Sequence, residues 1–201
     1  MSGSETGGDP TVLAVSGSLR ETSYTHTALM HALVAAETAG AETSMLCLRE
    51  AALPMFDPDE DDQSVESYVR QVREADAVIL GSPVYHGSYS GALKNFHDFC
   101  SFDDYEDTAV ALLASAGGGS YGPTLEHMRS TVRGVHGHVI PQQVGIRSAY
   151  DKFEDDPDAP DGRAFTDDDI AERVATLGTE VVAMARRFGT GCAEQPPKTD
   201  D

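Results

Sequence analysis

Hydroxyl-bearing residues, a glycine and an arginine are gathered in a loop near the N-terminus, between an apolar run over 11–15 and a helix-like stretch from Tyr24. Glycine permits a tight turn, hydroxyls and helix N-terminal amides donate hydrogen bonds, and a guanidinium adds a planar cation. The pattern predicts a cradle for a terminal phosphate, or a ligand-free helix cap of the same composition. Its predicted contacts are Ser16, Ser18, Arg20, Ser23, Tyr24 and Thr25.

Two familiar phosphate loops are excluded by this segment. No Gly-Lys-Ser/Thr follows, as the Walker motif requires, and the glycines do not recur at the spacing of the dinucleotide fingerprint. The remaining interpretation is a mononucleotide phosphate.

Two more loops of ligand-binding composition follow apolar runs. The first, 81–91, is rich in Gly, Ser, Pro and Tyr, follows the short strand-like run 77–80 and precedes a helix-like segment. The second, 115–122, contains three consecutive glycines and follows the apolar run 110–114. Because ligands of open α/β sheets lie beyond the carboxyl ends of the strands, these loops are expected to share one crevice with the first.

The three loops together resemble those of the NADPH-dependent FMN reductase family of flavodoxin-like proteins. Residues 17–20 with Ser23 and Thr25 resemble the family's phosphate loop, and 82–85 through 91–95 resemble its isoalloxazine loop. The resemblance runs from about Thr11 to Ile146. Departures at 84–86 and at Ser90 leave the subgroup, and therefore the electron acceptor, open.

The resemblance implies an FMN-dependent oxidoreductase whose chemistry resides in the flavin, with no catalytic side chain. Hydride from NADPH or NADH would pass to flavin N5 and on to free flavin, a quinone, an azo compound or a metal ion. Homodimers or homotetramers are implied as well. The implied flavin contacts beyond the phosphate loop are Pro83, Val84, Tyr85, His86, Gly87, Ser88, Ser115, Gly117, Gly118 and Gly119.

Two other functions fit a flavodoxin-like chain. A flavodoxin-type electron carrier would bind FMN without oxidising a nicotinamide; acidity favours it, and the reductase-like first loop opposes it. A non-catalytic scaffold would have lost FMN, which the intact loops oppose.

The net charge is −20, from 34 acidic and 14 basic residues. Such charge resembles that of salt-adapted proteins and excludes nucleic acid and anionic membranes as partners. Because the overall negative charge repels a phosphate, phosphate binding needs nearby hydrogen-bond donors and a cation. This favours a phosphate-binding role for Arg20. The alternative pairs Arg20 with Glu21 or Glu5.

Metal sites and disulfides are not predicted. Cys47, Cys100 and Cys192 lack metal-ligand or paired spacing and are interpreted as free thiols. The acidic run 57–62 lacks the glycine and spacing of a calcium loop, and His136 and His138 lack a third ligand. No membrane span or signal sequence is found, so a cytoplasmic location is expected.

Alternating apolar runs and helix-like segments predict a single α/β domain over 11–189, with a disordered lead-in over 1–10 and a disordered tail over 190–201. The arrangement expected is a flavodoxin-like, doubly wound, five-stranded parallel sheet of order 2-1-3-4-5. The expected strands are 11–16, 42–48, 77–81, 108–115 and 138–146. The expected helices are 24–39, 64–74, 91–99, 123–133 and 166–188, and 148–165 reads as a linker.

Overall fold

A single parallel sheet forms the centre of the protein, in a computed structural model that describes residues 8–60 and 62–191. The strand order is β2-β1-β3-β4-β5, and every neighbouring pair is parallel, as predicted. The strands are β1 Thr11–Ser16, β2 Glu42–Cys47, β3 Ala77–Pro83, β4 Ala109–Ser115 and β5 His138–Ile146.

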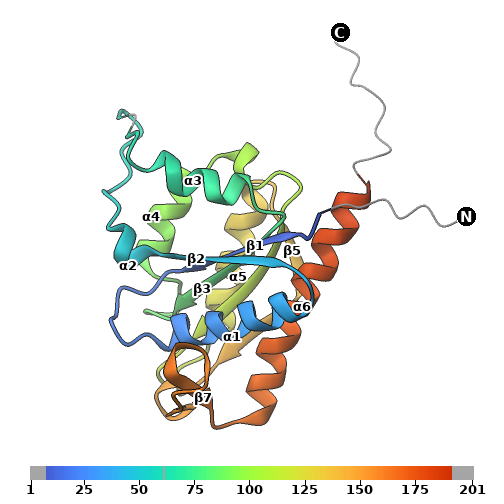
Figure 1. The fold of residues 1–201 in the computed structure, drawn as a ribbon. Coiled ribbons are helices and arrows are strands. Elements are labelled where there is room, and N and C mark those ends of the chain that lie inside the picture. Colours follow the sequence, from blue (N-terminus) through green and yellow to red (C-terminus); the bar gives the residue numbers. More distant parts are fainter. Residues whose placement is uncertain (1–7, 61, 192–201) are drawn as a thin grey trace, which may run out of the picture.

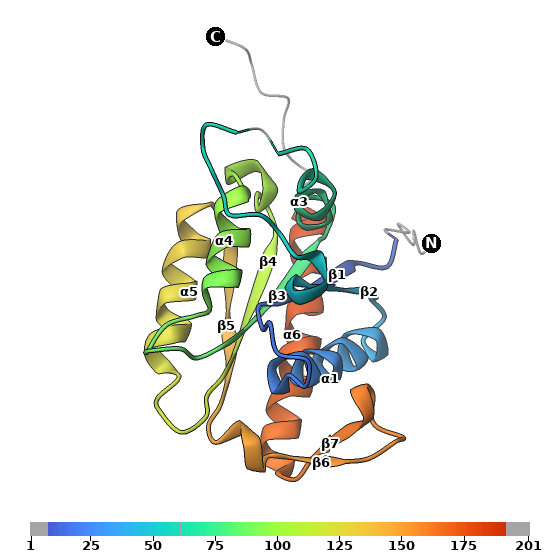
Figure 2. The same ribbon diagram turned by 90° about the vertical axis from the view of Figure 1, so that its left-hand side faces the viewer.

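Helices cover both faces of the sheet (Figures 1 and 2). One face carries α1 Tyr24–Thr38 and α6 Asp168–Gly191. The other carries α3 Glu66–Arg73, α4 Gly91–Phe99 and α5 Gly122–Gly134. A single helical turn, α2 Leu48–Ala51, follows β2 and has no counterpart in the sequence prediction.

Alternation along the strands divides the core into two layers. In β1, Val12 and Ala14 face α1 and α6, whereas Leu13 and Val15 face the opposite helices. Strands β3 and β4 are buried along their whole length, which is why they read as continuous apolar runs.

The outer strands show the features predicted for edges. Strand β2 alternates between exposed and partly buried residues over 42–45 and is buried at Leu46. Strand β5 contains Pro141, and its pairing with β4 shifts register between Val110 and Leu112. Proline has no amide N–H to donate to a neighbouring strand. It fits here because one side of an edge strand has no partner strand, and because a bulge interrupts the ladder of hydrogen bonds.

The segment 148–165 folds instead of acting as a linker, so that prediction was wrong. It contains two short antiparallel strands, β6 Phe153–Asp155 and β7 Arg163–Phe165, which lie beside the start of α1 (Figure 2). The ring of Phe153 stacks on Tyr24 at 5.4 Å and contacts Phe165 at 4.5 Å, between centroids. The contact with Tyr24, which is distant in the chain, stabilises this polar segment. The local composition alone suggests a linker.

The ends of the predicted domain differ slightly from the structure. Helix α6 continues to Gly191, so it includes the first two residues of the predicted tail; 192–201 lie outside the described residues. Residues 1–7 of the predicted lead-in also lie outside them, while the carbonyl of Pro10 accepts a hydrogen bond from Glu42 at 2.9 Å. The disorder predicted for the two ends stays a prediction.

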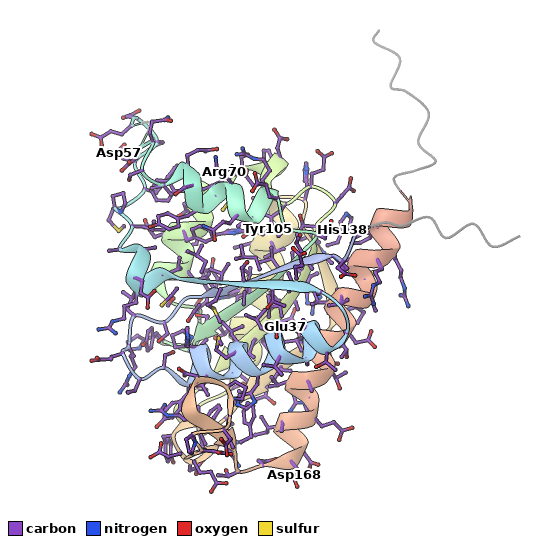
Figure 3. All side chains as sticks on the ribbon, viewed as in Figure 1. Glu37, Asp57, Arg70, Tyr105, His138 and Asp168 are labelled. Atoms are coloured by element: carbon purple, nitrogen blue, oxygen red, sulfur yellow. The ribbon has the colours of Figure 1, made fainter. Side chains whose placement is uncertain are left out.

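Among the acidic residues in the described part of the chain, Asp104 alone is buried. Asp57 lies near the tip of the loop between α2 and α3, away from the sheet, and Asp168 lies at the start of α6 (Figure 3). Cys47 and Cys100 are free thiols, half-buried and buried respectively, and Cys192 lies outside the described residues. Within the described ranges, no helix is long and apolar enough to cross a membrane.

Candidate functional site

The carboxyl ends of the central strands meet along one edge of the sheet. Ser16 pairs with Gly81, Pro83 pairs with Ser115, and Ser115 pairs with Ile146. The loops that follow these strands enclose a cavity of about 350 Å³. It is lined by Ser18, Arg20, Ser23, Tyr24, Thr25, Pro83, Val84, Tyr85, Ser115, Ala116, Gly117, Ala149 and Tyr150.

The loop after β1 forms a polar wall of this cavity at the start of α1. Ser23 is the N-cap of α1, and its hydroxyl accepts a hydrogen bond from the His26 amide at 3.1 Å. The other amides of the first helical turn have no acceptor inside the helix and, together with the helix dipole, favour an anion. The helix start expected after this loop is present, and phosphate binding there stays a prediction.

A smaller cavity of about 170 Å³ adjoins the first and shares Ser18, Arg20 and Ser23 with it. Ser16 lines this side cavity; its hydroxyl is buried and has no hydrogen-bond partner in the described part of the chain. A buried hydroxyl without a partner costs about 1–3 kcal/mol. An acceptor from outside the protein, such as a phosphate oxygen, would remove that cost.

Arg20 is exposed and forms no ion pair with any described residue, so its guanidinium can reach a ligand in either cavity. Glu21, a proposed partner of Arg20, lies 4.0 Å from Arg49 instead. Glu5 lies outside the described residues. The side cavity also contains Glu21, Glu50 and Asp161, so an anion placed there needs Arg20 and Arg49 to offset three carboxylates.

Ser90 joins the first and second loops. Its hydroxyl donates to the carbonyl of Gly17 at 2.6 Å and caps α4 by accepting from Leu93 at 3.1 Å. A Cβ on Gly17 would lie 2.8 Å from the Leu93 Cβ and 3.0 Å from the Gly81 oxygen, so only glycine fits this approach. The departure at Ser90 therefore has a structural role as a clamp.

The second loop makes a tight turn at Tyr85–Ser88. The Tyr85 amide donates to the Ser88 carbonyl at 2.9 Å, and the reverse bond is 3.1 Å. His86 and Gly87 have φ of 52° and 81°, the sign pattern of a type I′ turn. The turn fixes the base of Tyr85, whose side chain is 49% exposed in the cavity wall.

Small residues from the end of β4 form the base of the cavity. The Ser115 hydroxyl shares a buried hydrogen bond with that of Thr25, with an Oγ–Oγ distance of 2.6 Å. A Cβ on Gly117, Gly118 or Gly119 would meet no atom within 4 Å, so crowding does not require these glycines. Their open backbone fits the predicted approach of a ligand, and only Gly117 lines the cavity.

Most of the predicted contacts lie around one space. Ten of them line the main cavity, and Ser16 lines the side cavity. The others line neither cavity: His86, Gly87, Ser88, Gly118 and Gly119. Sequence reasoning missed three lining residues of the main cavity: Ala116, and Ala149 and Tyr150 after β5. The rule that ligands lie beyond strand ends applied to β5 as well.

The family model for NADPH-dependent FMN reductases matches residues 10–151, more than half of the chain. The chain belongs to the NADPH-dependent FMN reductase family. The matched region contains all four loops that build the main cavity, including the loop after β5.

Curated relatives of this FMN reductase family member include two azoreductases. An FMN-dependent NADPH-azoreductase of Staphylococcus saprophyticus is 39% identical over 93 residues, 46% of this chain and 50% of the relative. One of Staphylococcus haemolyticus is 35% identical over 120 residues, 59% of this chain and 61% of the relative. The chain therefore matches about half to three fifths of their length.

Solved structures support the fold of this family member over a longer span. FerB of Paracoccus denitrificans, a flavoenzyme NAD(P)H:(acceptor) oxidoreductase, superposes with a TM-score of 0.68 at 21% identity, covering 89% of this chain and 98% of FerB. At this identity the likeness establishes a flavodoxin-like fold.

Proposed function

We propose that the protein is an FMN-dependent NAD(P)H oxidoreductase. The observation that carries the proposal is the buried Ser16 hydroxyl, which has no partner among the described residues and lines the side cavity that adjoins the main one. Family membership and the azoreductase relatives support the same function.

In this proposal, the loop after β1 binds the FMN phosphate. Ser16, Ser18 and Ser23 offer hydroxyls, the first turn of α1 offers amides, and Arg20 supplies a cation. The loops after β3 and β4 surround the isoalloxazine, with Tyr85 in the wall and Ser115–Gly117 as the base. When bound, FMN supplies the redox chemistry, accepting hydride from a nicotinamide and passing electrons to an acceptor.

The donor is NADPH or NADH, and the acceptor is a small molecule. The relatives named azoreductases support an azo compound as one acceptor, besides free flavin, quinones and metal ions. The role of the protein is to hold two planar reactants in contact and limit access of water, because no acid–base group is needed for hydride transfer to flavin.

Anaerobic reduction tests the proposal. The protein is purified in high salt with FMN, free flavin is removed, and absorbance is recorded while NADPH and then NADH are added. Bleaching of bound flavin is the expected result. Bound flavin that stays yellow would instead support a flavodoxin-type electron carrier, and absence of bound flavin would overturn both.

Arg20→Ala tests the phosphate loop separately. Loss of a charge-assisted hydrogen bond is expected to weaken FMN binding about tenfold. Arg173 is an exposed residue of α6 that lines neither cavity, so Arg173→Ala makes the same charge change outside the site and should leave FMN affinity unchanged. Equal affinities of the two variants would remove Arg20 from the site.

We further propose a cytoplasmic homodimer or homotetramer from a salt-adapted organism. The net charge of −20 supports salt adaptation. An apolar groove of about 400 Å³ beside the first loop, with exposed Leu19 and Met55, supports self-association. Light scattering in high salt tests this, and a monomeric mass would refute the oligomer.

A further inference from the structure

Two exposed tyrosines line the main cavity from different strands. Tyr85 follows β3 and Tyr150 follows β5, and β4 lies between these strands in the sheet. Their side chains are 49% and 63% exposed. The other exposed large apolar side chains of the described residues do not line this cavity.

The turn that carries Tyr150 is well anchored. Ser148 has φ of 50°, and the turn Ala149–Asp151 follows it. The Ala149 amide donates to the Ala116 carbonyl at 3.0 Å, and the Ala149 side chain is buried. The Thr166 hydroxyl donates to the Asp151 carbonyl at 3.2 Å. The backbone on both sides of Tyr150 is thus fixed while its ring remains largely exposed.

An aromatic ring exposed on a fixed backbone is suited to binding. The backbone around Tyr150 is already ordered in the folded protein. Binding of a planar ligand against the ring therefore costs little conformational entropy of the loop. Offset stacking of a planar ligand on an exposed aromatic ring, and removal of the two faces from water, both favour binding. Tyr150 lies on the loop after β5, outside the three loops assigned to FMN.

We propose that Tyr150 is a positioning residue for the second planar reactant, an aromatic electron acceptor such as a quinone. The inference rests on the proposed function and deepens it, because it assigns substrate contact to the loop after β5, on which no FMN contact was predicted. Tyr150 sets acceptor preference by shape: flat aromatic acceptors gain its ring contact, and compact inorganic acceptors do not.

Direct binding to the oxidised holoenzyme tests this without turnover. With no nicotinamide present, anthraquinone-2-sulfonate cannot be reduced, so its Kd is measured by quenching of protein or flavin fluorescence. Tyr150→Leu should raise that Kd about 3- to 10-fold, the factor that an aromatic pair supplies. The FMN Kd should change by less than about twofold. Tyr150→Phe should bind both ligands about as the wild type does.

A control variant and a second acceptor separate this role from general damage. Phe102→Leu removes another exposed ring, stacked on His136 outside the cavity, and should change neither Kd. With donor present, Tyr150→Leu should raise KM for the quinone by a larger factor than it changes the rate with ferricyanide.

The outcomes distinguish two kinds of failure. A wild-type protein that binds no FMN would overturn the proposed function, and the assignment of Tyr150 with it. A holoenzyme whose quinone Kd is the same in Tyr150→Leu and wild type would overturn the inference alone. So would an equal loss of FMN and quinone affinity, because Tyr150 would then belong to the FMN site.

Discussion

Thr25 and Ser115, 90 positions apart in the chain, share a buried hydrogen bond with an Oγ–Oγ distance of 2.6 Å. The bond ties the first turn of α1 to the last residue of β4, and both residues line the main cavity. The polar wall and the base of the cavity therefore keep their relative position without a ligand.

Thr25→Val should lower the free energy of unfolding by about 1–2 kcal/mol, because Ser115 would keep a buried hydroxyl without its partner. Urea unfolding without FMN measures this effect. Thr38→Val is the matched control: its hydroxyl bonds only the Val34 carbonyl and is exposed, so the change should be within about 0.5 kcal/mol. Equal effects of the two variants would show that the Thr25–Ser115 bond adds no stability.

Ser16→Ala should affect FMN binding and leave the stability of the apoprotein unchanged. The Ser16 hydroxyl has no partner in the described part of the chain, so its removal should not lower the stability of the apoprotein. If it binds the phosphate, FMN affinity should fall about tenfold or more, the value of a hydrogen bond to a charged group. Fluorescence titration with FMN and urea unfolding without it give the two numbers. Unchanged FMN affinity would remove Ser16 from the site.

Gly178→Ala should disrupt the contact between α1 and α6. A Cβ on Gly178 would lie 2.2 Å from the backbone oxygen of Ala32, so the helices would have to separate. Overpacking of this kind costs about 3 kcal/mol. Thermal unfolding should show a large drop in Tm, whereas Gly134→Ala, whose added Cβ meets no atom within 4 Å, should not.

His97 should make the protein less stable in mild acid. Burial lowers the pKa of His97 below its usual value near 6.5, despite a smaller opposing effect of the Thr131 backbone. The folded state therefore favours the neutral ring, and stability falls as pH drops through about 6.5 and on towards the folded pKa.

The measurement is the difference in urea-unfolding free energy between wild type and His97→Leu at several pH values. The carboxylates titrate in both proteins, so the difference isolates His97. The wild type should lose stability relative to the variant as pH falls below about 6.5. A difference independent of pH would contradict this prediction.

Sequence patterns were sufficient to predict those features that depend on residues close together in the chain. The apolar runs of β3 and β4 and the hydroxyl-rich loop before α1 each depend on a few neighbouring residues, so these strands and the first loop could be predicted. The sheet order was expected instead from the alternation of strands and helices and from the flavodoxin-like topology. The same motif predicted Ser16 as a phosphate contact, and the structure places Ser16 in the side cavity. Helix ends were less exact, since α6 continues past Phe188.

Other features depend on contacts that sequence spacing does not reveal. The hairpin of β6 and β7 exists because Phe153 and Phe165 pack beside Tyr24, far away in the chain. Tyr150 carries no motif, and only the fold shows that its turn rests on Ala116. The three glycines after Ser115 were assigned as a group, and the structure places only Gly117 in the cavity lining.

The main cavity takes residues from Ser18 to Tyr150, on loops after four different strands. Closing such distant loops comes late in the folding of a parallel sheet, so a partly folded chain has no complete cavity. A ligand of this cavity stabilises only the finished fold. Added ligand should therefore slow unfolding far more than it speeds folding, and would protect the protein kinetically whenever the cavity is filled.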